Sequence, residues 1–293
     1  MDRKSFLQSL LLLPIASAAM NLNELNKITS GFPTTEPMPV LFYGHGSPMN
    51  AIEDNLFTKG WKESIKNLPE PSAILCISAH WETNGTFVTA MTKPRTIHDF
   101  GGFPPELFAV QYPAPGSTDL AQETKQVVKS IEIGFDNEWG LDHGCWSVVR
   151  QLYPNANIPV IQLSLDYTKQ GAYHYELAKE LGSLRRKGIL VIGSGNMVHN
   201  LGMINWRMQD SGFDWAEEAN LKLKQLILQN DHTQLANYKT LGKSMQLSIP
   251  TPEHFLPLLY VLGLKGRDEK ISFFNDKSTM GSISMTSIKI EKA

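Results

Sequence analysis

Cysteine is scarce in this sequence, and its two cysteines form no motif. Cys76 and Cys145 are far apart in a chain of 293 residues. A disulfide scaffold or a cysteine metal site needs several cysteines at short, regular spacing, so neither class is supported. Cys76 lies inside an apolar run, which predicts a small residue of the core.

An excess of charge of either sign is also lacking. The formal net charge is −2, charged residues make up 19% of the chain, and no basic stripe is present. Proteins that bind nucleic acids need a positive surface to neutralise phosphates, so we expect no nucleic-acid partner. The hydrophobic share of 42% is ordinary for a globular protein with a buried core.

No apolar run is long enough for a comfortable membrane span, and we expect no membrane partner. The first residues still need separate treatment. Arg3 and Lys4 precede an apolar stretch that ends in small residues, a pattern typical of a signal peptide. Residues 3–7 also look like a twin-arginine export signal with lysine in the second position. Residues 1–36 are therefore interpreted as a signal-like or flexible segment, with a retained N-terminal helix as the alternative. We expect a cytoplasmic location, with the periplasm as the alternative.

Three short apolar runs lead into histidines. Residues 39–44 precede His45, residues 73–79 precede His80, and a third run ends in a glycine-rich turn before His199. Short apolar runs bounded by glycine are typical of buried strands. Because the carboxyl ends of parallel strands lie at one edge of a sheet, we expect these imidazoles to converge there. Convergent imidazoles commonly hold a transition metal.

Strand and helix patterns alternate through most of the chain. This alternation predicts an α/β fold with a central, largely parallel or mixed sheet flanked by helices. No repeat or linker divides residues 37–293, which are interpreted as one domain. A first helix is predicted over residues 50–68 with Asn50 as its cap, and another is predicted to open at Thr251.

The segment from Pro94 to Gly116 is rich in proline, glycine and aromatic residues. Long loops inside compact domains are usually functional. We therefore expect Phe100, Phe103 and Tyr112 to form an aromatic wall over a ligand. The alternative is a loop that packs its aromatic residues against one another.

The histidines of element ends and of Gly- or Pro-marked turns are the candidate metal ligands. They are His45, His80, His143, His199 and His254. Zinc would imply hydrolysis by activated water, whereas ferrous iron with open positions would imply oxygen chemistry. The candidates are scattered and no HExxH motif occurs, so spacing alone does not choose between the metals. His174, on a helix predicted over residues 169–187, is interpreted as a surface residue.

Seven segments carry a more specific signal: Gly44-His45-Gly46-Ser47-Pro48-Met49, Ser78-Ala79-His80-Trp81, Ile97-His98-Asp99-Phe100-Gly101-Gly102-Phe103-Pro104, Tyr112-Pro113-Ala114-Pro115-Gly116, Asp142-His143-Gly144, Gly195-Asn196-Met197-Val198-His199-Asn200 and Pro250-Thr251-Pro252-Glu253-His254. In this order, between residues 39 and 290, they resemble the DODA-type extradiol ring-cleaving dioxygenases. These form a branch of the class III, or LigB-like, catechol dioxygenases. The resemblance implies a catalytic LigB-like domain over residues 37–293.

The resemblance also implies one divalent metal ion per chain. His45, His80 and His254 are the implied ligands, and His199 is implied as a fourth ligand or as the acid/base. Fe(II) is expected for catalysis, and Zn(II) is the ion that purification is expected to leave in some preparations. The wider family uses a glutamate as the third ligand, so Glu253 is the alternative to His254.

The implied reaction is extradiol 4,5-cleavage of a catechol such as L-DOPA, so a small catechol and O₂ are the expected partners. His199 and His143 are the implied catalytic residues. His98 and Asp99 are expected to hold the polar tail of the substrate. Asp142 is expected to orient an imidazole. The sequence does not indicate an oligomeric state.

Two other functions remain open at this point. A zinc-dependent hydrolase is favoured if Glu253 is a free base. A non-catalytic, Memo-like metal-binding protein, which has a similar fold, is favoured if the loop from Pro94 to Gly116 fills the metal cleft.

Overall fold

The apolar runs of the sequence form the strands of a large sheet. The computed structural model describes residues 31–293, and most of the predicted signal-like segment lies outside these described residues. The strands of the sheet are β1 (Val40–Gly44), β2 (Ala73–Thr83), β3 (Phe87–Thr89), β4 (Gly134–Asp136), β5 (Val160–Asp166), β6 (Ile189–Gly195), β7 (Glu269–Phe274) and β10 (Ser287–Lys292). A separate pair is formed by β8 (Ser278–Thr279) and β9 (Ile283–Ser284).

Within the described residues the large sheet has eight strands in the order β4-β3-β5-β2-β6-β1-β10-β7. The four central strands, from β5 to β1, run parallel to one another. Three neighbour pairs are antiparallel, namely β3 with β5, β1 with β10 and β10 with β7. The sheet is therefore mixed with a parallel centre, which confirms the predicted α/β fold.

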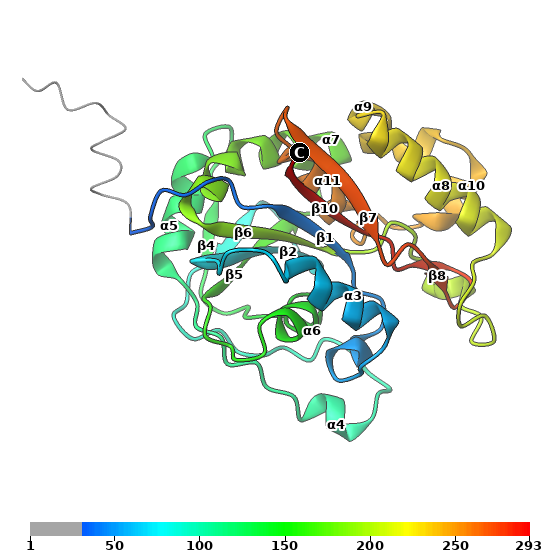
Figure 1. Cartoon of the computed structure of the whole chain (residues 1–293), viewed down its shortest axis with the longest axis horizontal. Helices are drawn as coiled ribbons and strands as arrows, with labels where there is room; N and C mark the ends of the chain where they lie inside the picture. Colours follow the sequence, from blue (N-terminus) through cyan, green and yellow to red (C-terminus); the bar gives the residue numbers. More distant parts are fainter. Residues whose placement is uncertain (1–30) are drawn as a thin grey trace, which may run out of the picture. The chain divides into compact units, whose positions relative to one another are not determined.

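Helices cover both faces of this sheet, as Figure 1 shows. The α-helices are α3 (Leu56–Ile65), α4 (Pro105–Phe108), α5 (Thr118–Val127), α6 (His143–Leu152), α7 (Gly171–Glu180), α8 (Asp214–Leu228), α9 (His232–Ala236), α10 (Lys243–Ser248) and α11 (Leu256–Gly263), and the 3₁₀ helices are η1 (Pro48–Ala51), η2 (Leu181–Lys187), η3 (Leu201–Met203) and η4 (Tyr238–Thr240). On one face of the sheet α6 packs on β2 and β6, and α3 packs against α6. On the other face α11 packs on β1, β2 and β6. Strands buried on both faces read as continuous apolar runs, which explains the sequence pattern.

Two helix starts differ from the prediction. Helix α3 begins after Asn55, whose side chain accepts from the backbone N–H groups of Phe57 and Thr58 while Thr58 Oγ1 accepts from Asn55 N. This reciprocal capping box is stronger than the cap expected from Asn50, which instead lies in η1. The segment after Thr251 forms turns, and α11 begins only at Leu256.

His174 is fully buried, so its interpretation as a surface residue is wrong. Its helix α7 packs against both α11 and α9, so more than one face of the helix is covered. Nδ1 of His174 lies 3.2 Å from the Tyr260 hydroxyl. Burial lowers the pKa of His174 to about 4, so the buried ring is neutral at pH 7.

Among residues 31–293, none of the helices combines the length and apolar character needed to cross a bilayer.

Far from the strand ends that carry the histidines, a buried ion pair ties η2 to β7. Arg185 Nη1 lies 3.0 Å from Glu269 Oε2, and Arg185 Nη2 also contacts Glu269 Oε1. The two side chains are 5% and 11% exposed. Burial alone would raise the pKa of Glu269, but the hydrogen bonds from Arg185 and from the Gly266 backbone outweigh it and hold the pKa below its usual value.

We expect Glu269→Gln to lower the free energy of unfolding by about 3 kcal/mol at pH 7, because it leaves the Arg185 charge buried and unpaired. The matched control is Glu63→Gln, which breaks the ion pair of Glu63 with Lys66, two side chains that are 70% and 66% exposed. This variant should lose under about 0.5 kcal/mol of unfolding free energy. Since the folded-state pKa of Glu269 is lowered, its contribution is present above the unfolded-state pKa and is lost as the pH falls through the folded-state value. Urea unfolding at several pH values measures both effects. Equal losses in the two variants would contradict the prediction.

Candidate metal centre

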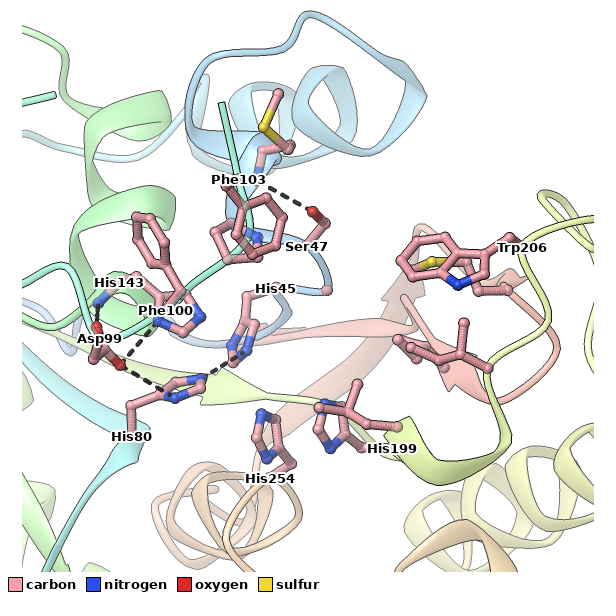
Figure 2. A pocket seen from close by; sticks show the side chains of 17 residues that line it. His45, Ser47, His80, Asp99, Phe100, Phe103, His143, His199, Trp206 and His254 are labelled. Atoms are coloured by element: carbon pink, nitrogen blue, oxygen red, sulfur yellow. Dashed lines mark hydrogen bonds and ion pairs between the residues drawn. The ribbon is translucent and has the colours of Figure 1, made fainter. Parts of the chain in front are cut away.

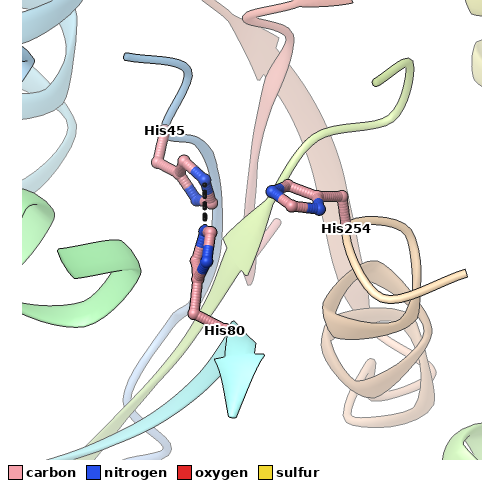
Figure 3. Close-up of side chains that lie close together, drawn as sticks. All are labelled: His45, His80 and His254. Atoms are coloured by element: carbon pink, nitrogen blue, oxygen red, sulfur yellow. Dashed lines mark hydrogen bonds between the residues drawn. The ribbon is translucent and has the colours of Figure 1, made fainter. Parts of the chain in front are cut away.

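The carboxyl ends of neighbouring parallel strands bring the predicted histidines to one edge of the sheet. His45 directly follows β1, and His199 follows β6 after a short turn. His80 lies in the second half of β2, where the pairing with β5 shifts register between Ile77 and Glu82. His254 precedes α11 and reaches the same place from the other side of β6 (Figure 3).

The backbone of the His254 segment lies directly against the end of β6. Asn196 N donates to the His254 carbonyl oxygen at 2.9 Å. A Cβ atom at Gly195 would lie only 2.1 Å from that same oxygen. Glycine is therefore required at this position for close approach of two backbones. The glycine-rich turn after β6 thus fixes where His254 enters the site.

Three imidazoles form the centre of the site: His45, His80 and His254. Each offers a ring nitrogen, and these atoms all lie within 4.8 Å of one another. Nε2 of His45 is 3.2 Å from Nε2 of His80. His45 and His254 are only 2% and 7% exposed. Figure 3 shows the three rings pointing into a common space.

The hydrogen bonds around His45 determine which of its nitrogens carries the proton. Ser194 Oγ donates its only proton to the Gly144 carbonyl oxygen at 2.6 Å. Nδ1 of His45 lies 3.0 Å from the same Ser194 Oγ. Since that hydroxyl has no second proton, His45 must donate through Nδ1–H, and its Nε2 carries a lone pair.

Carboxylates contact the other two rings. Nδ1 of His80 lies 3.3 Å from Asp99 Oδ2, and Nδ1 of His254 lies 3.1 Å from Glu253 Oε1. A carboxylate accepts, so His254 donates its hydrogen bond through Nδ1–H and its Nε2 is unprotonated, whereas His80 and Asp99 are in ion-pair contact. Histidines that bind a metal through one nitrogen usually donate the other N–H to such a partner. Glu253 thus contacts His254 as an orienting group.

The Nε2 atoms of His45 and His80 face each other at 3.2 Å, and His80 donates to His45 when its proton is on Nε2. A divalent cation that binds both nitrogens would displace that proton. Nitrogen ligands at about 2.1 Å from one ion are separated by about 3.0–3.4 Å at ordinary coordination angles. The residues present therefore fit a divalent metal ion.

The protonation states of the rings agree with this arrangement. Burial and the neighbouring imidazoles lower the pKa of His45 and of His254 well below the usual value. Burial and His143 lower the pKa of His80 to about 3, although Asp99 opposes this. All three rings are neutral at pH 7, which is the form that binds metal ions.

Asp99 also holds His143, a fourth ring of the site. Asp99 Oδ2 lies 2.9 Å from His143 Nδ1, and Asp99 Oδ1 accepts from His143 N at 2.8 Å. Burial alone would raise the pKa of Asp99, but the contacts with His143 and His80 outweigh it and lower the pKa. The ionised carboxylate therefore orients two imidazoles. The tail-binding role expected for Asp99 stays a prediction.

Asp142 does not take the role predicted for it. Its oxygens accept from Cys145 N, Ser78 Oγ and Gln162 Nε2, so it caps α6 and anchors that helix to the sheet. Asp99 is the residue that orients imidazoles instead. The sequence did not indicate this because Asp99 comes from a loop whose path depends on tertiary packing.

His199 lies beside the three-histidine centre. Its ring stacks on His254 with centroids 3.5 Å apart and planes 9° apart. Its nitrogens group with Glu253 and His254, not with His45 and His80. Within residues 31–293 neither ring nitrogen of His199 has a hydrogen-bond partner. Burial and His143 lower the pKa of His199 to about 4, so the ring is neutral at pH 7.

His98 contacts the protein rather than the cavity. Its Nε2 lies 2.9 Å from the Val110 carbonyl oxygen, and its ring packs near Phe100 and Trp146. His98 is not among the residues that line the cavity. Its predicted contact with the substrate tail therefore stays a prediction.

A cavity of about 410 Å³ opens above the histidines (Figure 2). Its lining residues are His45, Gly46, Ser47, Pro48, Met49, His80, Asp99, Phe100, Phe103, His143, His199, Leu201, Ile204, Trp206, His254, Met280 and Ile283. Phe100 and Phe103 belong to its wall, as expected, whereas Tyr112 is buried elsewhere and donates to the Tyr153 carbonyl oxygen at 2.9 Å. Trp206 was not expected at the cavity, and no local sequence signal marks it.

Fold and site together define a class: an α/β protein whose open histidine centre faces a cavity suited to a small aromatic molecule. Residues 37–288 match the family model described as the catalytic LigB subunit of aromatic ring-opening dioxygenase. The chain therefore belongs to the LigB family, and it is an extradiol ring-cleaving dioxygenase.

Individual relatives agree with this family. The chain is 48% identical over 257 residues to a protein of Escherichia coli K12 named 4,5-DOPA dioxygenase extradiol, covering 86% of this chain and 94% of that one. It is 35% identical over 255 residues to a Beta vulgaris protein of the same name, covering 85% and 94%. A crystal structure of an uncharacterized protein from Escherichia coli K12 matches with a TM-score of 0.76 and 43% identity, covering 87% of this chain and all (100%) of that one.

Proposed function

We propose that this chain is a metal-dependent extradiol dioxygenase that opens a catechol such as L-DOPA by 4,5-cleavage, with one Fe(II) bound by Nε2 of His45, His80 and His254. The observation that carries the proposal is the set of three neutral imidazoles whose ring nitrogens all lie within 4.8 Å of one another and line one cavity. The names of the relatives support the substrate class.

When bound, ferrous iron supplies a template and a Lewis acid for the two catechol oxygens and O₂. The chain itself supplies proton transfer and orientation. The neutral His199 ring has no hydrogen-bond partner among the described residues, so it is free to accept a proton from a catechol hydroxyl. We propose it as the acid/base of the reaction.

His143 is the second group proposed to act on the substrate. Because its Nδ1–H is donated to Asp99, its Nε2 carries a lone pair and can accept a hydrogen bond or a proton. The Asp99 carboxylate would stabilise the resulting imidazolium. Phe100 and Phe103 in the cavity wall would contact the flat face of the aromatic ring and limit access of water.

Neither condition that would favour a zinc hydrolase or a non-catalytic metal-binding protein is met. Glu253 is not a free base, because its Oε1 accepts from both His254 and Thr251 Oγ1. The loop from Pro94 to Gly116 lines the cavity without filling it, since about 410 Å³ remains. A zinc hydrolase and a non-catalytic metal-binding protein therefore gain no support.

The proposal is tested by oxygen uptake with protein stripped of metal and reloaded anaerobically with Fe(II) or Zn(II). We expect L-DOPA or a simpler catechol to cause O₂ uptake only with the Fe(II) protein, together with a new absorbance from the ring-opened product. No uptake with any catechol at full iron occupancy would contradict the proposal. Hydrolysis of an ester by the zinc-loaded protein without O₂ uptake would instead favour the hydrolase.

A further inference from the structure

The cavity above the histidines contains no lysine or arginine side chain. Its titratable lining residues are the histidines and Asp99. Figure 2 shows Trp206 at the far side of the cavity from His143, and Leu201, Ile204 and Met280 are further apolar residues of the lining.

A second hollow of about 430 Å³ adjoins the first cavity. It shares Ser47, Met49, Trp206 and Met280 with the first cavity, so the two meet at the Trp206 indole. The charged residues that line the second hollow are Glu53 and Asp210, both exposed carboxylates. Among residues 31–293, no lysine or arginine lines either space. Arg207, which directly follows Trp206 in the sequence, is exposed and lines neither space.

The indole of Trp206 offers a broad apolar surface at this junction. Its side chain is 70% exposed, and Leu201 beside it is 61% exposed. Large apolar groups left uncovered around a cavity are typical of a ligand-binding surface. A substituent that leads away from the histidine centre would meet these apolar groups before it met any charge.

We propose, building on the proposed function, that the site prefers catechols whose side chain carries no net negative charge and discriminates against an anionic side chain. An anionic tail loses hydration on entry, finds no lysine or arginine to pair with, and meets Glu53 and Asp210 in the second hollow. An uncharged tail of the same size loses less and gains contact with Trp206 and Leu201.

The test compares 3-(3,4-dihydroxyphenyl)propionic acid with its primary amide, which has the same shape without the negative charge. With Fe(II)-loaded protein we expect kcat/KM for the amide to exceed that for the acid at least ten-fold, measured by O₂ uptake at pH 7.5. Anaerobic dissociation constants of the two compounds should differ in the same direction. A ratio below ten with both rings opened would overturn the inference and leave the proposed function intact. If neither compound nor 4-methylcatechol is opened, the proposed function fails, and this inference fails with it.

Two variants locate the origin of the preference. Leu201→Arg places a cation on the cavity wall and should lower the amide-to-acid ratio at least five-fold, whereas Leu201→Gln should not. Arg207→Ala, outside both hollows, should leave the ratio unchanged. A ratio that responds to Arg207→Ala but not to Leu201→Arg would overturn the inference, because an exposed side chain would then set the charge preference.

Discussion

Replacement of His45 with alanine is expected to abolish both metal binding and O₂ uptake. The His45 ring is 2% exposed, and its Nε2 lies 3.2 Å from that of His80 in the space that the three-histidine centre encloses. Removing an orienting partner of a metal ligand typically costs 10–100-fold in affinity, so removing the ligand itself should exceed about a hundred-fold. Turnover should fall below detection. Competition with a chromophoric chelator measures the affinity, and an oxygen electrode measures the turnover.

Two further variants make this prediction specific. Ser194→Ala keeps the ligand but removes the hydroxyl that holds Nδ1–H of His45, so it should weaken metal binding by about 10–100-fold. His232→Ala removes a histidine that contacts the Tyr175 hydroxyl on another part of the fold, and it should leave the metal affinity unchanged. Retained catechol opening by metal-free His45→Ala protein would refute the metal assignment. So would an equal loss of metal in the His45 and His232 variants.

The strands were predictable from the sequence because burial on both faces leaves a continuous apolar signal. Residues 189–195 illustrate this: they are buried throughout in β6, and glycine marks the turn that follows. Helix starts were less predictable, because two asparagines near the start of α3 both look like caps. Only the contact of Asn55 with Thr58 decides between them. His174 was misjudged because the sequence does not tell how many helices pack around α7.

The site was predictable where its residues stand at strand ends, and less so where loops supply them. His45, His80 and His199 follow apolar runs that become parallel neighbours, so their convergence follows from topology. The roles of Asp99 and Trp206 depend on how long loops fold over that edge. Asp99 was expected at the substrate tail, yet both of its oxygens contact His143 or His80. Such pairings join residues far apart in the chain, and no local pattern encodes them.

Replacement of His199 with alanine is expected to slow ring opening about 10²–10⁴-fold while the metal stays bound. The His199 ring stacks on His254 but its nitrogens do not group with those of His45 and His80, and neither has a hydrogen-bond partner within the described residues. It is therefore placed to exchange a proton with the substrate without being needed to hold the ion. The loss should fall on kcat more than on KM. Metal content and steady-state kinetics of the same preparation measure both quantities.

His254→Ala is the matched comparison, because the two rings lie face to face and only one belongs to the three-histidine centre. The His254→Ala protein should lose the metal. The metal affinity of His199→Ala should stay within about three-fold of that of the unchanged protein, a smaller change than the 10–100-fold loss expected when even an orienting partner is removed. Added imidazole should restore part of the turnover of His199→Ala, since a small base can fill the space left beside His254. If His199→Ala instead loses metal as His254→Ala does, His199 is a fourth ligand. The proton transfer would then belong to His143, whose Nδ1–H is already held by Asp99.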